Sequence, residues 1–196
     1  MGQELEIEFK NLLTREEYKK LLLSYSVTDN EIIEQHNLYF DTPDFLLKAA
    51  GSALRVRVKN EKNTLTLKQP HKEALLETHQ NITDDELENI KNGKTFPTGE
   101  VYKALKALSV DPNRVTFLGT LTTFRFEKQL SNGLLVLDRS CYLGTEDYEL
   151  EFEVTDLEAG KTAFYYFLKQ NQIPERKTPN KIRRFFDYKQ KLNGEQ

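Results

Sequence analysis

The sequence predicts an α+β fold, with about eight antiparallel strands and helices packed outside them. Two observations lead to this expectation. Apolar and polar residues alternate with period two along several short stretches, as they do in strands that bury one face. Helix caps and helically spaced apolar residues fall between those stretches. Because no repeat or Pro/Gly/Ser-rich linker divides the chain, we expect a single domain over residues 1–196.

The strands are predicted from the alternation and from the turns between them. Alternation is clearest at residues 4–10, 54–59, 64–68, 123–127 and 148–154. Further strands are expected near 34–40, 75–82 and 134–139. The polar stretches 60–63 and 131–133 are typical of hairpin turns, so the strands on either side of each should pair antiparallel.

Two helices are predicted from capping boxes, in which a Thr is followed three residues later by a Glu. Thr14 with Glu17 begins the first, and Thr83 with Glu86 begins the second. Gly93 stands where a helix C-terminus needs a left-handed residue, so the second helix should end just before it.

Three more helices are expected in the rest of the chain. Apolar residues at helical spacing predict helices over 100–108 and 161–171. Thr178 followed by Pro179 is typical of a cap with proline at the first helical position. We therefore expect the last helix to begin there and to run to Lys189.

Composition narrows the class of protein. The net charge of −3 argues against a nucleic-acid partner, since such modules are usually basic. No stretch approaches the roughly 18 continuous apolar residues of a membrane span, and residues 1–23 lack the apolar core of a signal peptide. Cys141 is the single cysteine, which fits a reducing compartment. We expect a cytoplasmic protein without a membrane partner.

The charged faces of the predicted strands carry the functional signal. The first and last strands present carboxylates at 4, 6, 8, 149, 151 and 153, whereas the strands at 53–59 and 64–68 present cations and threonines. Same-face neighbours lie about 7 Å apart. Two carboxylates at that distance repel by about 0.6 kcal/mol in water and about 2.4 kcal/mol at an effective dielectric of 20. If this face is enclosed, its carboxylates need protons or a bound cation; if it is in contact with water, they do not. The pattern alone leaves both an enclosed face and a solvent-exposed face open.

Clustered carboxylates favour a hard cation such as Mg²⁺ or Mn²⁺. Arg55, Arg57, Lys68 and Arg125 suit phosphate oxygens. An acidic wall facing a basic wall would thus form a metal–polyphosphate site. A zinc site is not expected, because the three histidines lack zinc-ligand spacing and Cys141 is their only cysteine partner. No P-loop, G-x-S-x-G or GxGxxG motif is present.

Several segments resemble the CYTH domains, also called triphosphate tunnel metalloenzymes. Residues 6–10 (EIEFK) resemble the ExExK signature that opens these domains. Further resemblances follow in order over nearly the whole chain, at 39–42 (YFDT), 51–57 (GSALRVR), 65–68 (LTLK), 137–138, 142–144, 148–151 and 180–184. The resemblance implies a closed eight-stranded antiparallel β-barrel that forms a tunnel, with charged residues inside and helices outside.

The resemblance also implies roles for individual residues. The expected metal ligands for Mg²⁺ or Mn²⁺ are Glu6, Glu8, Glu149, Glu151 and Glu153. The expected triphosphate-binding residues are Lys10, Arg55, Arg57, Lys68, Arg125, Lys181 and Arg184, although Arg184 could equally be a surface residue. The catalytic residues would be Glu8, Lys10 and Glu151. The sequence leaves open the roles of Glu4, Glu77, Lys128 and Asp138; Lys128 has the strand parity of an outward residue, and Asp138 could be a ligand or a strand-end acceptor.

The implied activity is metal-dependent hydrolysis of a triphosphate, with inorganic triphosphate as the first choice. The class IV adenylate cyclases are similar to this family, so conversion of ATP to cyclic AMP and pyrophosphate is the alternative. A polyphosphate- or nucleotide-binding module without chemistry is a second alternative. The expected partner is a small-molecule triphosphate or nucleoside triphosphate, and the sequence is compatible with a homodimer without specifying one.

Overall fold

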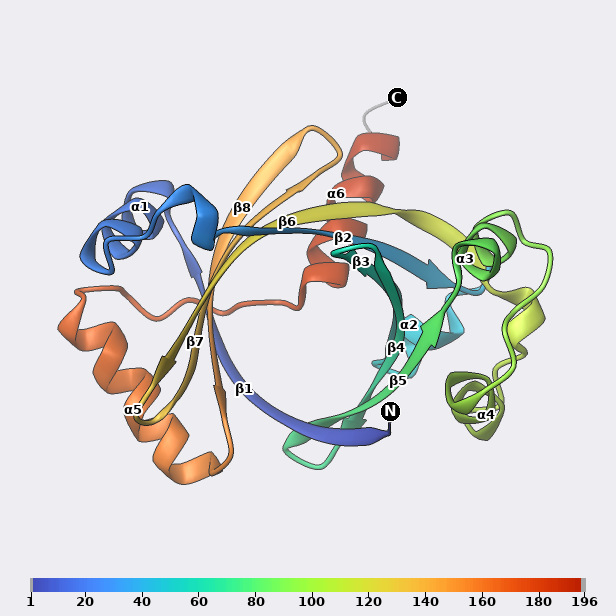
Figure 1. Cartoon of the computed structure of the whole chain (residues 1–196), viewed down its shortest axis with the longest axis horizontal. Helices are drawn as coiled ribbons and strands as arrows, with labels where there is room; N and C mark the ends of the chain where they lie inside the picture. Colours follow the sequence, from blue (N-terminus) through green and yellow to red (C-terminus); the bar gives the residue numbers. More distant parts are fainter. Residues whose placement is uncertain (1, 195–196) are drawn as a thin grey trace. The chain divides into compact units, whose positions relative to one another are not determined.

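The computed structural model describes residues 2–194, apart from the side chain of residue 193. Its strands close into an antiparallel barrel in the order β1-β5-β4-β3-β2-β6-β7-β8 (Figure 1). In chain order the strands are β1 (Gln3–Leu13), β2 (Ile33–Asp41), β3 (Ala53–Lys59), β4 (Lys62–His71), β5 (Ala74–Ile82), β6 (Thr116–Leu130), β7 (Gly133–Tyr142) and β8 (Thr145–Val154). This confirms the predicted fold class.

The helices are α1 (Arg15–Ser24), α2 (Leu46–Ala49), α3 (Asp84–Lys91), α4 (Glu100–Ala107), α5 (Leu157–Gln170) and α6 (Lys181–Gly194), with short 3₁₀ turns η1 (Asp29–Glu31) and η2 (Pro112–Arg114). None of these helices is long and apolar enough to cross a membrane. The chain divides into two units, one made of the chain up to Glu6 with Gln35–Leu121, the other of Ile7–Glu34 with the chain from Thr122 onward. The single-domain expectation stays a prediction.

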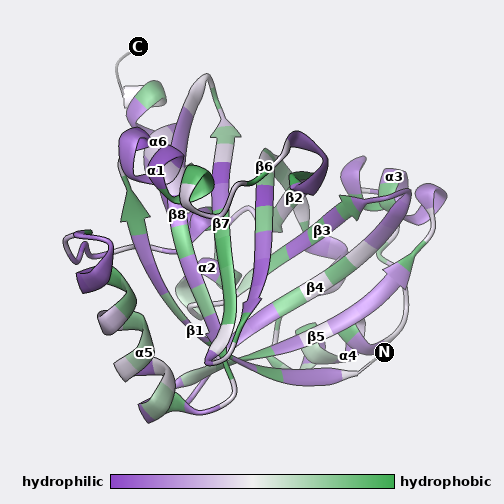
Figure 2. Cartoon of the chain, turned by 60° about the vertical axis from the view of Figure 1, so that its left-hand side comes forward, coloured by the Kyte–Doolittle hydropathy of each residue, from purple (hydrophilic) through white to green (hydrophobic). Residues whose placement is uncertain are grey.

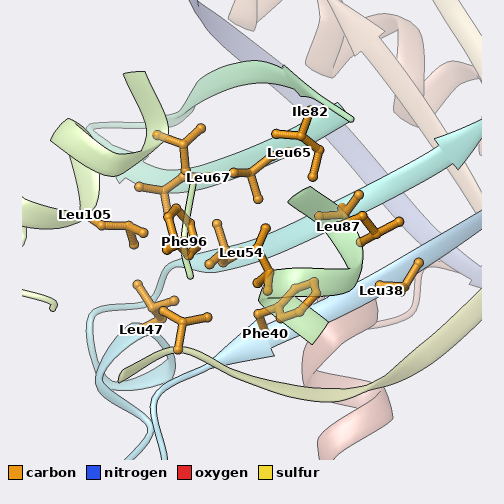
Figure 3. Close-up of a cluster of buried hydrophobic side chains, with 14 of the residues drawn as sticks. Leu38, Phe40, Leu47, Leu54, Leu65, Leu67, Ile82, Leu87, Phe96 and Leu105 are labelled. Carbon is orange, nitrogen blue, oxygen red and sulfur yellow. The ribbon is translucent and has the colours of Figure 1, made fainter. Parts of the chain in front are cut away.

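The first unit is a set of antiparallel strands whose apolar face is covered by helices. The turn between β3 and β4 uses Asn60 and Glu61, both with positive φ (50° and 59°), as a tight two-residue hairpin requires. One face of β3 and β4 is apolar. Its leucines and those of α3 and α4 form a single buried cluster, with Leu54, Leu65, Leu67, Leu87 and Leu105 among its members (Figure 3).

The second unit packs α1 and α5 against the apolar face of β6, β7 and β8. Figure 2 shows the alternation of hydrophobic and hydrophilic residues along β8, where Leu150 and Phe152 are buried among Tyr18 and Phe164 of the helices. Gly160 lets α5 approach β8 closely, because a Cβ atom there would lie 2.4 Å from the Val154 side chain. With the apolar face covered in this way, the other face of these strands is left for the polar residues.

The predicted helix starts are partly confirmed. Both capping boxes form as expected, at α1 and at α3. However, α5 begins four residues before the predicted 161, where the Asp156 side chain accepts a hydrogen bond from the Ala159 N–H. Two turns and the short α2 were not predicted.

The predicted start of the last helix is wrong. Helix α6 begins at Lys181, and Asn180 caps it by accepting a hydrogen bond from the Arg183 N–H. The Thr178 hydroxyl is used elsewhere: it accepts a hydrogen bond from the Leu12 N–H of β1 and donates one to the Arg176 carbonyl. A tertiary hydrogen bond has thus overridden a local cap signal, and the helix runs to Gly194, beyond the predicted Lys189.

Asp41, in the segment that resembles YFDT, holds the start of α2. The residue before this helix, Phe45, has positive φ and no side-chain acceptor. Asp41 is 2% exposed, and its carboxylate accepts hydrogen bonds from the N–H groups of Thr42, Leu47 and Lys48 at 2.7–3.0 Å. The Thr42 hydroxyl accepts from the Leu46 N–H at 3.0 Å, so the carboxylate and this hydroxyl together cap the start of α2 and fix the chain that leads into β3.

We predict that Asp41→Ala lowers the free energy of unfolding by about 2–4 kcal/mol, because buried N–H donors lose their acceptor. Urea unfolding measures this. Asp156→Ala, which removes an exposed cap from α5, should cost only about 1 kcal/mol and serves as the control. Equal losses in the two variants would contradict the role given to Asp41.

Candidate functional site

Strand register brings charged residues together on one face of the second unit. Asp138 of β7 lies opposite Arg125 of β6 and opposite Glu149 of β8. Glu151, two residues further along β8, lies opposite Lys10 of β1. Since side chains alternate between the faces of a strand, these five residues share a face. We call them, with Asp147, Lys181 and Arg184, the α6 cluster.

Arg125 bridges two strands of this cluster through its planar guanidinium group. Its Nε and Nη2 atoms donate to the two oxygens of Asp138 at 2.8 and 2.6 Å, and Nη2 also donates to Glu151 at 2.7 Å. Asp138 is fully buried and Arg125 is 7% exposed. Burial by itself would raise the pKa of Asp138, but the charges of Arg125 and Lys181 lower it below its usual value. Asp138 is therefore an ionised partner of cations.

Helix α6 supplies two further cations, Lys181 and Arg184, which lie three residues apart and so share a helix face. Lys181 Nζ pairs with Asp138 at 2.9 Å, with Glu149 at 3.0 Å and with Glu151.

Arg184 binds Asp147 through two hydrogen bonds, and its Nη2 donates to Glu149 at 2.6 Å. Its side chain is 9% exposed, which decides the alternative left open by the sequence: Arg184 belongs to the cluster and is not a surface residue.

The segment before α6 is tied to the end of β1. Asn11 is fully buried; its Oδ1 accepts from the Arg176 N–H at 2.7 Å and its Nδ2 donates to the Pro174 carbonyl at 3.1 Å. The Arg176 guanidinium group forms a two-point ion pair with Glu17 of α1. These contacts fix the chain five residues before Lys181, so they help to set where the cations of α6 lie.

The electrostatics keep the buried carboxylates ionised. Burial would raise the pKa of Glu151, but Lys181, Arg125 and Lys10 together lower it well below its usual value. Burial would likewise lower the pKa of Lys10, yet Glu8, Glu149 and Glu151 raise it above its usual value. Lys10 Nζ also pairs with Glu8 at 2.7 Å. The α6 cluster thus consists of mostly buried carboxylates and cations in direct contact with each other.

The first unit has a smaller charged group, here called the β5 cluster: Glu4, Glu6, Lys68, Glu77 and His79. Lys68 Nζ pairs with Glu6 at 2.5 Å and with Glu77. Burial raises the pKa of Glu6, and the neighbouring Glu77 raises it further, against the lowering effect of Lys68. The sequence did not assign Glu77 a role, but it is 4% exposed and lies in the cluster.

Two arginines of β3 share the polar face of the first unit. Arg57 Nε donates to Asn37 Oδ1 of β2 at 3.0 Å. Arg55 lies opposite Thr66 of β4. Its Nε–H is buried and donates to no described acceptor, and its charge helps to lower the pKa of Glu77. The β3–β4 register puts both arginines on the same face as Lys68.

The expected division into an acidic wall and a basic wall stays a prediction, but the charges of the described residues are already paired with each other. Carboxylates of β1, β7 and β8 pair with cations from other elements: Lys68 of β4 in the first unit, and Arg125 of β6 and Lys181 of α6 in the second. The physical reason is the cost of burial. Carboxylates that lie about 7 Å apart away from water need compensating charge close by, and side chains supply it.

The remaining sequence assignments differ in their outcome. Glu153 lies directly opposite Glu8 in the β1–β8 register, and both are partly buried. Lys128 is exposed, and its charge acts on Glu31 of η1, in agreement with the predicted outward parity. Sequence reasoning missed Asp147 and His79. The carboxylate of Asp147 could have been found, because it continues the alternation of β8 by one step.

The chemistry of the α6 cluster fits a divalent cation. Carboxylate oxygens are the ligands that Mg²⁺ and Mn²⁺ prefer. Glu149 is fully buried, and its Oε1 atom accepts no hydrogen bond from any described residue. A buried carboxylate oxygen left in this way is unfavourable unless it meets a cation, so Glu149 is suited to a metal ion.

Comparison with known proteins identifies the family. The chain matches the family model described as the CYTH domain over residues 4–186. It belongs to the CYTH domain family. A Bacillus subtilis protein named "Putative triphosphatase YjbK" is 46% identical over 191 residues, which cover 97% of this chain and 99% of that protein.

Solved structures support the same assignment for this CYTH protein. The crystal structure of a putative adenylate cyclase from Bacillus halodurans matches with a TM-score of 0.91 and 44% identity, over 95% of this chain and 100% of that one. A Hippeastrum protein, described as a putative adenylyl cyclase with a dominant triphosphatase activity, matches with a TM-score of 0.72 and 24% identity, over 95% of this chain and 96% of that one. At that identity the second likeness shows the fold alone.

We predict that Lys181→Met lowers the free energy of unfolding at pH 7 by about 3–5 kcal/mol, because it leaves buried carboxylates without their partner. In the unsubstituted protein the pKa values of Asp138 and Glu151 are lowered, so their stabilisation is present above the unfolded pKa values near 4 and is lost as the pH falls through the folded ones. The variant has raised carboxylate pKa values, so its deficit should shrink as the pH falls towards 4.5.

Urea unfolding at pH 7 and pH 4.5 measures both parts of this prediction. Lys161→Met, on the exposed face of α5, is the matched control and should change little at either pH. A deficit of the same size at both pH values would mean that Lys181 stabilises the fold by packing and not by charge.

Proposed function

We propose that this CYTH protein is a divalent-metal-dependent enzyme that hydrolyses a triphosphate, with inorganic triphosphate as the first choice of substrate. The observation that carries the proposal is the α6 cluster, in which buried carboxylates and buried cations satisfy each other. The 46% identical relative from Bacillus subtilis, whose name describes it as a putative triphosphatase, supports the same reaction.

The paired charges of the cluster favour a metal complex of a polyphosphate over a bare anion. A bare anion would bind Lys181 and Arg184 and leave Glu149 and Glu151 buried without their partners, at a cost of several kcal/mol. A metal–triphosphate complex brings anionic oxygens for the cations and a metal ion for the carboxylates. The buried cations and the buried carboxylates can then each find a new partner of opposite charge, and no buried charge is left alone. This disfavours a binding module that works without metal.

Specific residues take specific parts in this proposal. In the second unit, Glu8, Glu149, Glu151 and Glu153 would hold Mg²⁺ or Mn²⁺; when bound, the ion neutralises phosphate oxygens and lowers the pKa of a water ligand. Lys10, Arg125, Lys181 and Arg184 of the same unit would bind phosphate oxygens. In the first unit, Glu6 stays a predicted metal ligand, and Arg55, Arg57 and Lys68 stay predicted phosphate-binding residues. Arginine suits this task because its planar fork matches two phosphate oxygens at once.

The catalytic residues of the proposal are Glu8, Lys10 and Glu151. Lys10 keeps its proton, since the neighbouring carboxylates raise its pKa, and so can stabilise negative charge on the departing phosphate. The Glu8 carboxylate would orient the attacking water and accept its proton. Glu151 would position Lys10 and Lys181, which both lie next to it.

Adenylate cyclase activity is the second candidate, because the 44% identical Bacillus halodurans protein is described as a putative adenylate cyclase. The two reactions share the triphosphate but differ in the nucleophile. A hydrolase uses water and releases phosphate. A cyclase uses the 3′-hydroxyl of the ATP ribose and releases cyclic AMP and pyrophosphate.

A metal-by-substrate screen tests the proposal and separates the two candidates. Purified protein is incubated with inorganic triphosphate, ATP or thiamine triphosphate, each with Mg²⁺, Mn²⁺ or chelator, and the products are separated by chromatography. We expect phosphate release from inorganic triphosphate that requires metal. Cyclic AMP from ATP would favour the cyclase, and triphosphate binding that is equal with and without metal and never leads to turnover would contradict both.

We predict that Glu8→Gln lowers kcat for triphosphate hydrolysis by about 10²–10⁴-fold, because an amide cannot accept the proton of water. Circular dichroism and urea unfolding should show an intact fold. Glu16→Gln, on the exposed side of α1, is the matched control and should keep full activity. Unchanged phosphate release by Glu8→Gln would remove Glu8 from the catalytic residues.

A further inference from the structure

The β5 cluster contains a second set of metal-ligating atoms, apart from the carboxylates of the α6 cluster. Glu4 of β1 lies directly opposite Glu77 of β5, and His79 is the next residue on the same face of β5. His79 Nε2 lies 2.9 Å from Glu4 Oε1 and 3.3 Å from Glu77 Oε2. One ligand atom from each of the three residues lies within 4.8 Å of the others.

These separations suit a bound ion. Two ligand atoms that each lie about 2.0–2.1 Å from a tetrahedral ion are about 3.3–3.4 Å apart. The two separations from Nε2 are close to that value, so a small adjustment of the exposed Glu4 side chain would complete the geometry. The fourth position of a tetrahedron would stay open for water or for another oxygen ligand.

The imidazole ring is oriented from its other side. Thr66 of β4 lies opposite His79, and its hydroxyl oxygen is 2.9 Å from His79 Nδ1. When Nδ1 carries the proton and donates a hydrogen bond to the Thr66 hydroxyl, the lone pair of Nε2 is directed at the two carboxylates. Such a hydrogen bond on the distal nitrogen is the usual device that fixes a metal-binding histidine. Three electron-pair donors then converge, and only a positive group between them, a metal ion or a proton, makes the arrangement favourable.

The two oxygens of Glu77 have different partners, so one of them is available to an ion. Oε1 pairs with Lys68, whereas Oε2 is the atom that faces His79. A metal ion on Oε2 would therefore leave the Lys68 pair in place. The local charges agree, because Lys68 pairs with Glu6 and Glu77, whereas Glu4 pairs with the imidazole of His79.

We propose that Glu4, Glu77 and His79 form a site for a divalent transition-metal ion such as Zn²⁺, Co²⁺ or Mn²⁺. An imidazole ligand separates this site from the all-oxygen carboxylate sets that Mg²⁺ prefers. The proposal does not depend on triphosphate hydrolysis, since the ligands are in place without a substrate.

Co²⁺ titration in the presence of excess Mg²⁺ tests the site, because Mg²⁺ fills carboxylate sites and Co²⁺ with an imidazole ligand absorbs visible light. We expect one Co²⁺ per chain with an absorption band that free Co²⁺ lacks. His79→Gln should weaken Co²⁺ binding by at least about 100-fold, and Thr66→Val, which only loses the orienting hydrogen bond, by about 10–100-fold. His71→Gln, at an exposed position of β4, is the matched control and should bind as the unsubstituted protein does.

Two results would overturn the proposal. His79→Gln could bind Co²⁺ as tightly as the unsubstituted protein, or the unsubstituted protein could show no such band; in either case these three residues do not form a metal site. Should His79→Gln fail to fold, Glu4→Gln replaces it, since Glu4 is exposed and its amide is a poor ligand. Because no substrate is present in the titration, loss of the hydrolase assignment would leave its result unchanged.

Discussion

Compensation of buried negative charge is the constraint on which the rest of this structure depends. The polar face of β7 and β8 carries Asp138 and Glu149, both fully buried. Carboxylates in such a place need cations in contact, because isolated charge away from water costs several kcal/mol. Lys181 meets this need for both residues at once. The position of α6, and of the segment that Asn11 and Arg176 tie down before it, is what makes that contact available.

The same constraint connects stability to chemistry. In the free protein the buried carboxylates and cations neutralise each other. When a metal–triphosphate complex binds, its phosphate oxygens would replace the carboxylates next to the cations, and its metal ion would replace the ammonium groups next to the carboxylates. Stability and binding therefore use the same residues, among them the ion pair of Lys181 with Glu151. Removing one partner of such an ion pair is expected to lower the stability of the fold. Stability should therefore be measured alongside activity for every substitution in this cluster.

How far the sequence could predict this arrangement depends on the range of the interactions. Alternation along β8 identified Glu149 and Glu151, because each strand buries one apolar face and the pattern is local. The burial of Arg184 and the pairing of Asp138 with Arg125 depend on which elements meet in space, and no local pattern encodes that. The start of α6 failed for the same reason: Thr178 has a good cap sequence, but its hydroxyl accepts from Leu12, a residue far away in the chain. His79 was dismissed on spacing to other histidines, whereas its neighbours Glu4 and Glu77 come from strand pairing.

The two clusters differ in how completely they are neutralised, and this difference bears on where a metal ion would be held without substrate. In the α6 cluster the cations Lys10, Arg125, Lys181 and Arg184 already contact the described carboxylates, so an ion there must compete with them. In the β5 cluster Lys68 serves Glu6 and Glu77, and the group next to Glu4 is an imidazole, which is neutral unless it binds a proton. An ion bound by Glu4, His79 and the Oε2 atom of Glu77 would leave the Lys68 pairs in place. Of the two clusters, the β5 cluster is therefore the better candidate for a resident metal, and the α6 cluster for an ion that arrives together with the phosphate oxygens its cations would bind.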